Sequence, residues 1–383
     1  MLSLFSDKIR RVNSPTKKDV LKEAELGDCD SAVLYRLPFE KEKQLIIGKT
    51  QVLENGLSQQ MLSDTGFVVE AFDNKRSKGV FIKTGYSLVY ASSIPEEVEP
   101  EVQRIFSELT AAGLPEEIDF ETYKCQFEQM HCALSGGDIN KVILSRAKIE
   151  KDFPRQHLIQ MFHNLCENYP HAFVYVLNSS LTGLWIGAGP ELLLKDDGQQ
   201  LQTVSLAGTL PNDQHKHDWH PKELIEQQLV TDYVEKVLNA NEVLNYQRRG
   251  PSTMAAGQVK HLRTDFIFQK SYLNGNLVDL LYDLHPTPAV CGMSKNNAFQ
   301  LIQTVEDYDR RFYTGFLGPV NSGCFEFYVN IRCLQLGAGQ AALYVGGGLT
   351  RESQVEKEWA ETELKAETLL SVIKNMRNLQ AYE

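Results

Sequence analysis

The stretch Glu121–Arg146, ETYKCQFEQMHCALSGGDINKVILSR, joins a helix to a strand within one short segment. Residues Glu121–Leu134 predict a helix, and the run Ser135-Gly136-Gly137-Asp138 is typical of the turn that ends one. The apolar run Lys141–Arg146 then predicts a strand.

More strands and helices are expected on both sides of this stretch. A helix should begin at Pro221, where the missing N–H costs little, and run to about Leu238. A last helix should run from about Ser353 to Met376. The expected strands are Ser31–Leu37, Lys43–Ile47, Gly66–Ala71, Gly79–Thr84, His171–Leu177, Leu184–Gly187, Leu192–Lys195, Phe325–Leu336 and Ala341–Val345. Many strands with antiparallel-type turns, several helices and no regular βαβ alternation predict an α+β fold.

The chain has 383 residues, enough for two average domains or one large one. Its first part, residues 1–115, is a mixed region of short strands. The acidic stretch Pro95–Pro100 and the break near Gly113–Pro115 separate it from residues 116–383, which carry most of the motifs. We place a soft boundary there.

Composition excludes several classes of protein. The net charge of −11 argues against nucleic acid as a partner, because phosphate binding needs clustered Lys and Arg. The start, MLSLFSDKIRRVN, lacks the apolar core of a signal peptide, and no apolar run is long enough for a membrane span. The seven cysteines include no C-x-x-C pair, so reduced thiols are the simplest interpretation. These features predict a cytoplasmic location.

Two pairs of acidic residues have helical spacing. Glu223 and Glu226 share one helix face, and Glu358 and Glu361 repeat this spacing on the last helix. Brought together, these carboxylates would suit Mg²⁺ bound with waters and an anionic molecule. Two solvated helix faces are the alternative, which spacing alone favours.

Two residues could move protons. Lys141 lies among apolar neighbours, where burial would favour the neutral amine that a general base requires; a strand-end lysine reaching water is the alternative. Glu191 follows the Gly189-Pro190 turn and precedes an apolar run, as a buried general acid could. An ordinary turn glutamate is the alternative, and the local sequence favours it.

Two features could bind an anion. Gly346-Gly347-Gly348 follows a strand and could form a turn whose N–H groups bind an anion, or a plain tight turn. Arg332 lies in the expected strand Val329–Cys333, where its guanidinium should have a carboxylate partner, either a ligand or a structural one. In contrast, His215, His217 and His220 lie in a polar stretch that we interpret as a solvated loop rather than a metal site.

The order of these motifs resembles that of the chorismate-utilising enzymes, a family that includes isochorismate, anthranilate, aminodeoxychorismate and salicylate synthases. The resemblance covers about residues 120–375. The blocks that carry it are KVILSR (141–146), GPELLLK (189–195), SLAGT (205–209), KELIEQ (222–227), KHLRT (260–264), LHPTPAVCG (284–292), NIRC (330–333), YVGGGLT (344–350) and EKEWAETELK (356–365). So many blocks in one order make the resemblance specific.

The resemblance implies a fold of two stacked antiparallel β-sheets flanked by helices, to which a divergent segment, 1–115, contributes strands. It implies that Lys141 activates water and that Glu191 protonates a leaving hydroxyl. It implies Mg²⁺ as cofactor, with Glu226 and Glu361 as principal ligands and Glu223 and Glu358 as supporting carboxylates. The residues expected to bind the substrate, chorismate, are His261, Ala289, Tyr313, Arg332, Gly208, Thr209, Gly346, Gly348 and Lys365.

Three positions favour one activity within the family. Lys141 favours water as nucleophile, where ammonia-using relatives resemble glutamine. Ala207 stands where aminodeoxychorismate synthases carry a lysine, and Ala289 resembles isochorismate synthases. We therefore expect an isomerase that converts chorismate to isochorismate, as a monomer, in menaquinone or siderophore synthesis, with menaquinone favoured.

Three other functions stay open. They are a salicylate synthase, an ammonia-using anthranilate-type component, and a chorismate-binding protein without catalysis. Lys222-Glu223 and Glu226-Gln227 depart from the family's Lys-Asp and Glu-His pairs, and the loop before them is shorter. These departures affect the expected metal geometry.

Overall fold

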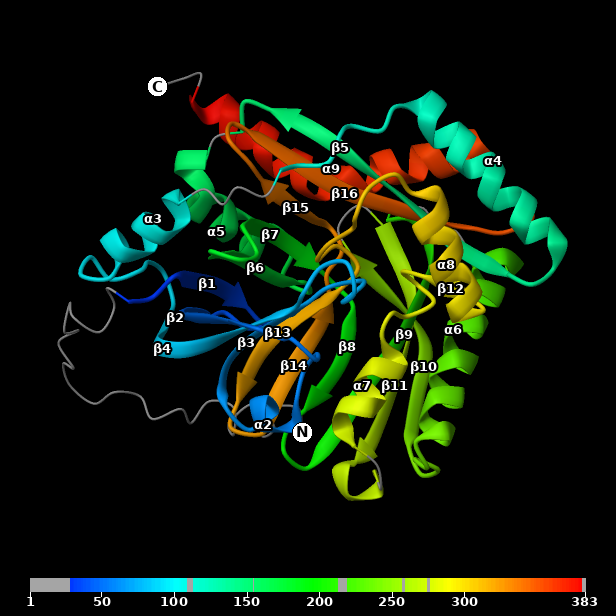
Figure 1. Ribbon diagram of the computed structural model, residues 1–383, viewed down its shortest axis with the longest axis horizontal. Helices are drawn as coiled ribbons and strands as arrows, with labels where there is room; N and C mark the ends of the chain where they lie inside the picture. Colours follow the sequence, from blue (N-terminus) through cyan, green and yellow to red (C-terminus); the bar gives the residue numbers. More distant parts are fainter. Residues whose placement is uncertain are drawn as a thin grey trace.

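The computed structural model describes residues 28–108, 113–153, 155–212, 219–256, 259–273 and 276–380. Its described strands pair antiparallel in one hydrogen-bonded order, β10-β11-β9-β8-β14-β13-β3-β4-β2-β1-β6-β7-β15-β16-β5-β12 (Figure 1). Helices cover this sheet from outside, so the predicted α+β class is confirmed. His215 and His217 lie outside the described residues.

Most of the predicted strands are present, but β2, β4 and β5 extend five or six residues further than predicted, and β9 to β13 were not predicted. They are β1 (Ser31–Arg36), β2 (Lys43–Val52), β3 (Thr65–Glu70), β4 (Val80–Tyr90), β5 (Lys141–Lys151), β6 (Phe173–Ser179), β7 (Leu184–Gly189), β8 (Leu192–Asp196), β9 (Gln200–Pro211), β10 (Gln247–Ala256), β11 (Val259–Gln269), β12 (Gly292–Met293), β13 (Phe316–Asn321), β14 (Cys324–Val329), β15 (Cys333–Leu336) and β16 (Gln340–Leu349).

The helices include the three that were predicted, as α4, α6 and α9. The full set in the described residues is α2 (Gln59–Leu62), α3 (Glu99–Ser107), α4 (Phe120–Gly136), α5 (Leu158–Asn168), α6 (Pro221–Ala240), α7 (Leu277–Leu284), α8 (Lys295–Val305) and α9 (Val355–Gln380). None of the helices in these residues is both long and apolar enough to cross a membrane.

The sheet folds over so that its two halves stack face to face. Phe173 on β6 stacks on Tyr328 on β14 with a centroid separation of 4.4 Å, although five strands lie between β6 and β14 in the sheet order. Phe67 on β3 joins the same interior cluster. The two stacked layers that were expected are therefore present, but they are continuous through β3, β4, β2 and β1 rather than separate sheets.

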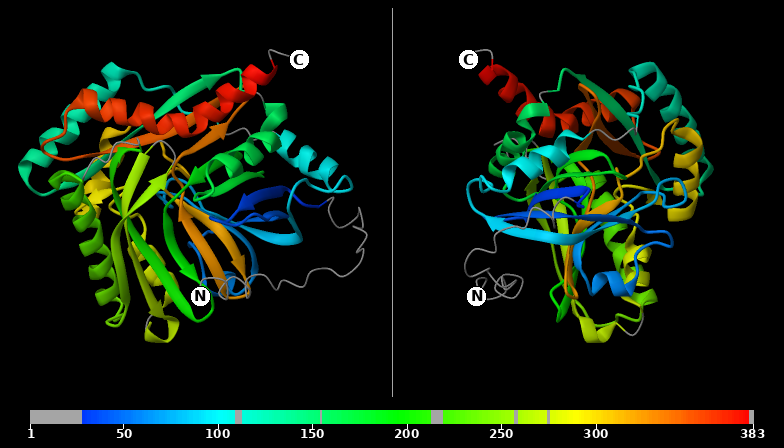
Figure 2. Two further views of the ribbon diagram at one scale, coloured as in Figure 1. Left: turned by 180° about the vertical axis from the view of Figure 1, so that it is seen from behind. Right: turned by 60° about the vertical axis from the view of Figure 1, so that its left-hand side comes forward.

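Each layer buries its outer face under helices. Helices α3, α5 and α9 pack on one layer around Ile186 and Leu343, and α6 and α7 pack on the other around Phe266 and Phe327. Figure 2 shows this arrangement from behind, with α9 across one layer and α6 along the other. Helices α4 and α8 cover β5 around Leu144. The inner faces of the two layers pack against each other and form the interior core.

Two local predictions were wrong. The expected strand Phe325–Leu336 is two strands, because residues 330–332 interrupt it and Arg332 takes a left-handed φ of 51°. Arg332 is therefore outside any strand. The glycines Gly346–Gly348 form no turn but continue β16 beside β5.

The strand needs these glycines for space. A Cβ on Gly348 would lie 2.8 Å from Cε of Lys141, and one on Gly346 would lie 2.9 Å from the Tyr313 hydroxyl. Real Cβ atoms essentially never come that close, so a side chain at either position would displace a neighbouring group. Glycine at these positions therefore lets the side chains of Lys141 and Tyr313 lie close to the backbone of β16.

Candidate active site

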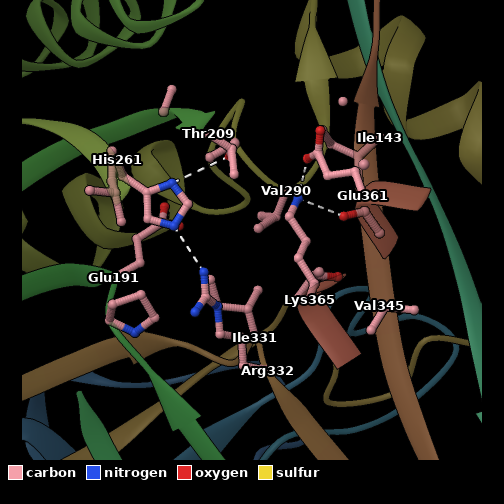
Figure 3. Close-up of a pocket in the computed structure, with 18 of the residues that line it drawn as sticks. Ile143, Glu191, Thr209, His261, Val290, Ile331, Arg332, Val345, Glu361 and Lys365 are labelled. Atoms are coloured by element: carbon pink, nitrogen blue, oxygen red, sulfur yellow. Dashed lines mark hydrogen bonds and ion pairs between the residues drawn. The ribbon is translucent and has the colours of Figure 1, made fainter. Parts of the chain in front are cut away.

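A pocket lies where the two ends of the sheet order approach each other. Strands β5 and β16 from one end and β9 and β11 from the other supply its walls, and helices α6 and α9 each contribute a carboxylate (Figure 3). The pocket holds about 790 Å³ of space, part of which is open to solvent.

The pocket brings together most of the residues singled out from the sequence. Both expected proton-transfer residues and all of the expected substrate-binding residues line it: Lys141, Glu191, Gly208, Thr209, His261, Ala289, Tyr313, Arg332, Gly346, Gly348 and Lys365. Of the four expected metal ligands, Glu226 and Glu361 line the pocket, whereas Glu223 and Glu358 do not.

Lys141 begins β5 and is buried, with 2% of its surface exposed. Its Nζ donates to Oε1 of Glu226 over 2.7 Å. Burial acts to raise the pKa of Glu226, but the charge and hydrogen bond of Lys141 outweigh it and lower that pKa. The lysine side chain is therefore buried and ion-paired. The alternative interpretation required a strand-end lysine that reaches water.

Glu191 lies between β7 and β8, and 3% of it is exposed. Burial raises the pKa of its carboxyl group to about 7, although a hydrogen bond from Thr287 and the charge of Lys141 act to lower it. The Thr287 hydroxyl donates to Oε1 over 3.1 Å. A carboxyl group with this pKa is partly protonated near neutral pH and can donate a proton.

His261 is neutral and held in one tautomer. Burial lowers its pKa to about 3, and the charge of Arg332 adds to this effect. Its Nδ1 lies 2.9 Å from the carbonyl oxygen of Gly208, which can only accept, so Nδ1 carries the proton. Nε2 then accepts from Nη2 of Arg332 over 2.9 Å (Figure 3).

Arg332 places a positive charge in the wall of the pocket. Burial lowers its pKa to about 10, which still leaves the guanidinium cationic at neutral pH. On the opposite side, Lys365 pairs with Oε1 of Glu361 over 2.7 Å and donates to the carbonyl of Gly346 over 2.9 Å (Figure 3). Cationic groups on two sides suit an anion with more than one carboxylate.

The acidic pairs offer oxygen ligands without forming a closed metal cage. Among the described residues, no three or more His, Cys, Asp or Glu side chains converge on one point as a metal centre. Burial raises the pKa of Glu358, and the negative charge of Glu361 adds to it. Oε2 of Glu223 is buried and has no hydrogen-bond partner within the described part of the chain.

A cation beside these carboxylates would offset the repulsion between Glu358 and Glu361 and would give Oε2 of Glu223 a partner. Mg²⁺ is typically bound by one or two carboxylates, with waters and ligand oxygens completing its octahedron. The residues present therefore fit Mg²⁺ held jointly with an anionic molecule, with Glu226 and Glu361 nearest to the pocket.

Sequence reasoning did not single out Thr287. It lies within the HPTPAVCG block, but it is 96 residues from Glu191, and no local pattern indicates that the two side chains meet. Nor did helical spacing indicate that Glu226 would pair with Lys141, 85 residues away. Both contacts depend on the closure of the sheet.

A buried acid, a paired lysine and cationic walls around one pocket are typical of an enzyme that acts on a small anionic molecule. The family model described as "Chorismate binding enzyme" matches residues 86–374, about three quarters of the chain. This chain belongs to the chorismate-binding enzyme family.

Similar proteins carry consistent names. The vibriobactin-specific isochorismate synthase of Vibrio cholerae serotype O1 is 30% identical over 261 residues, 66% of each chain. Isochorismate synthase EntC of Escherichia coli K12 is 30% identical over 272 residues, 68% of each chain. These matches span about two thirds of the relatives' own lengths.

A solved structure shows the same fold. It is that of MenF, the menaquinone-specific isochorismate synthase from Escherichia coli, which aligns with a TM-score of 0.71 and 21% identity over 94% of this chain and 92% of that chain.

The raised pKa of Glu191 predicts a pH-dependent loss of stability. A carboxyl group with pKa about 7 when folded and near 4.5 when unfolded stabilises the protein fully below pH 4.5, and this contribution is lost as the pH rises through 7. In Glu191→Gln no such loss occurs. We expect the variant's free energy of unfolding, relative to wild type, to rise by up to about 3 kcal/mol between pH 4 and pH 8. Urea titrations at both pH values measure it; a difference independent of pH would show that Glu191 titrates normally.

Proposed function

We propose that this protein is an isochorismate synthase, an isomerase that converts chorismate to isochorismate. The observation that carries the proposal is that a buried lysine, Lys141, and a carboxyl group of raised pKa, Glu191, line the same pocket. The names of the relatives at 30% identity support it.

The proposed reaction moves one hydroxyl group. Water attacks C2 of chorismate and gives a proton to Lys141, the ring double bonds shift, and the bond between C4 and its oxygen breaks. The departing hydroxyl takes the proton of Glu191 and leaves as water. One water enters and one leaves, so the product is an isomer, and the protons on Lys141 and Glu191 are restored by exchange with solvent.

The other residues of the pocket would bind and orient the substrate. Arg332 and Lys365 supply positive charge toward its carboxylates, and neutral His261 keeps the Arg332 guanidinium in place. Glu226 and Glu361, with Glu223 and Glu358 behind them, would hold Mg²⁺, which when bound neutralises charge on the ring carboxylate.

Lys141 must lose its proton before it can act as a base. In this structure its Nζ is paired with Glu226, so the pair must separate as the site fills. If Glu226 held a metal ion, that carboxylate would have another partner, and its hold on the Lys141 amine would weaken. The base and a metal ligand are thus coupled by one contact.

The pathway stays a prediction. One relative is named for vibriobactin and one solved neighbour for menaquinone, so the names favour neither siderophore nor menaquinone synthesis, and we keep menaquinone as our proposal. The cytoplasmic location and the monomeric state also stay predictions.

Product analysis is the direct test of the proposed function. Purified protein incubated with chorismate should form isochorismate with Mg²⁺ present and none after treatment with EDTA. Chromatography of the products separates the alternatives. Salicylate would show that the site also eliminates pyruvate, and an aromatic amine formed only with ammonia would place the protein with the anthranilate-type enzymes. Binding of chorismate without turnover would contradict the enzymatic proposal.

Replacement of the proposed base should affect turnover more than folding. We expect Lys141→Ala to lower kcat by about 10²–10⁴-fold, the usual contribution of a general base. Lys148→Ala is a matched control, because Lys148 lies on the same strand but pairs with Glu363 away from the pocket. Initial rates and melting temperatures of both variants give the comparison. Full activity in Lys141→Ala would exclude this lysine as the base.

The acid role of Glu191 predicts the alkaline limb of the pH profile. Because Glu191 must be protonated, kcat/KM should fall as the pH rises above about 7. Thr287→Val removes a hydrogen bond that lowers the pKa of Glu191, so this limb should move to higher pH. Thr304→Val, on the exposed face of α8, should leave the limb in place. An unmoved limb in Thr287→Val would mean that another group controls it.

A further inference from the structure

Gln227 follows the proposed metal ligand Glu226 on α6 and points the other way, into the sheet. It is 3% exposed. Its Nε2 donates to the hydroxyl of Ser205 over 3.0 Å, to the carbonyl of Ser205 over 3.2 Å and to the hydroxyl of Thr264 over 3.1 Å. Ser205 and Thr264 lie on β9 and β11, the two strands that supply Gly208 and His261 to the pocket.

A second residue of α6 closes this buried polar cluster. The hydroxyl of Thr231, one turn further along, lies 2.8 Å from that of Ser205. Ser205, Thr264 and Thr231 are each at most 1% exposed, and no member of the cluster is charged. The cluster therefore holds α6 against the sheet. Because it contains no charged group, its hydrogen bonds do not vary with pH.

Gln227 is the first buried residue of α6. Leu224 and Ile225 before it are 45% and 61% exposed, and His220 at the N-cap makes no side-chain capping bond within the described residues. After it, Val234, Val237 and Leu238 bury the rest of the helix in the apolar core. The turn that carries Glu223 and Glu226 is thus held at its inner end by Gln227.

Stability alone does not account for an amide here. Oε1 of Gln227 is buried and has no hydrogen-bond partner in the described part of the chain. An unpaired buried acceptor costs free energy, which an apolar side chain of similar length would avoid. The remaining contribution of the amide is structural: its Nε2 hydrogen bonds fix the position of α6 relative to β9 and β11.

We infer that Gln227 is a positioning residue that sets the place of the Glu226 and Glu223 carboxylates, and through them the affinity for a divalent cation. The inference rests on the proposed function, which makes these carboxylates metal ligands. It concerns one hydrogen-bonding group that touches neither the cation nor the substrate.

Binding of Mn²⁺ to the purified protein, followed by the electron paramagnetic resonance signal of the free ion, tests this without catalysis. Gln227→Met keeps the length of the side chain and removes the donor. We expect it to weaken Mn²⁺ binding about tenfold, the equivalent of one lost hydrogen bond. The Mg²⁺ concentration for half-maximal turnover should rise by a similar factor, while kcat at saturating Mg²⁺ changes much less.

Two further variants separate positioning from folding. Thr231→Val breaks the same cluster one turn away from the carboxylates and should leave Mn²⁺ affinity near that of wild type. Gln227→His keeps an N–H donor and should restore most of the affinity that Gln227→Met loses. If Gln227→Met does not fold, Gln227→Asn takes its place, because it keeps the amide but shortens its reach by one methylene. It should weaken Mn²⁺ binding where Thr231→Val does not, and an equal loss in the two variants would overturn the inference.

The outcomes also separate this inference from the proposed function. Wild-type affinity for Mn²⁺ in Gln227→Met would overturn the inference and leave the isomerase proposal intact. Wild-type protein that neither binds Mn²⁺ nor needs Mg²⁺ for turnover would overturn both the metal site and the inference built on it.

Discussion

The contact between Lys141 and Glu226 joins two ends of one sheet that no described backbone pairing connects. Lys141 begins β5, next to last in the sheet order, and Glu226 lies on α6, which packs over β9 and β11 at the other end. Where strands do not pair, side chains must make the connection, and the gap between them is the pocket. The folding of the sheet over its interior core thus determines how far the lysine lies from the carboxylate.

Closure also buries most side chains of the site, and this burial shifts the pKa values of different groups in different directions. Burial disfavours the charged form of each group, so it raises the pKa of Glu191 and lowers those of His261 and Arg332. The consequences differ because the ordinary pKa values of Glu, His and Arg side chains differ. Glu191 becomes a proton donor near neutral pH, His261 becomes a neutral imidazole, and Arg332 stays cationic. Burial alone therefore gives one pocket an acid, a neutral hydrogen-bonding ring and a fixed positive charge.

Local sequence patterns predicted what depends on local structure. Periodicity located both ends of α6, the start of α9 and the start of β5 to within two residues, and the end of α9 to within four, because helix and strand periods are set by neighbours in the chain. The same reasoning failed at Gly346–Gly348 and at Arg332. The glycines are required by Lys141 and Tyr313, which come from distant parts of the chain, and the break at Arg332 separates strands from different layers. The ordered motifs, rather than periodicity, indicated which residues line the pocket, and even they did not reveal the contact from Thr287 to Glu191.

Positive charge exceeds negative charge among the side chains that line the pocket. Its lining cations are Lys141, Lys365 and Arg332, and its lining carboxylates are Glu226 and Glu361, with Glu191 partly protonated. Each of the two ionised carboxylates pairs with a lysine, and Arg332 adds a third positive charge to the wall. Under the proposed function, a substrate with two carboxylates would bring two further negative charges into a largely buried site, where unbalanced charge costs free energy. Glu226 and Glu361 would then hold a divalent cation that offsets part of this charge.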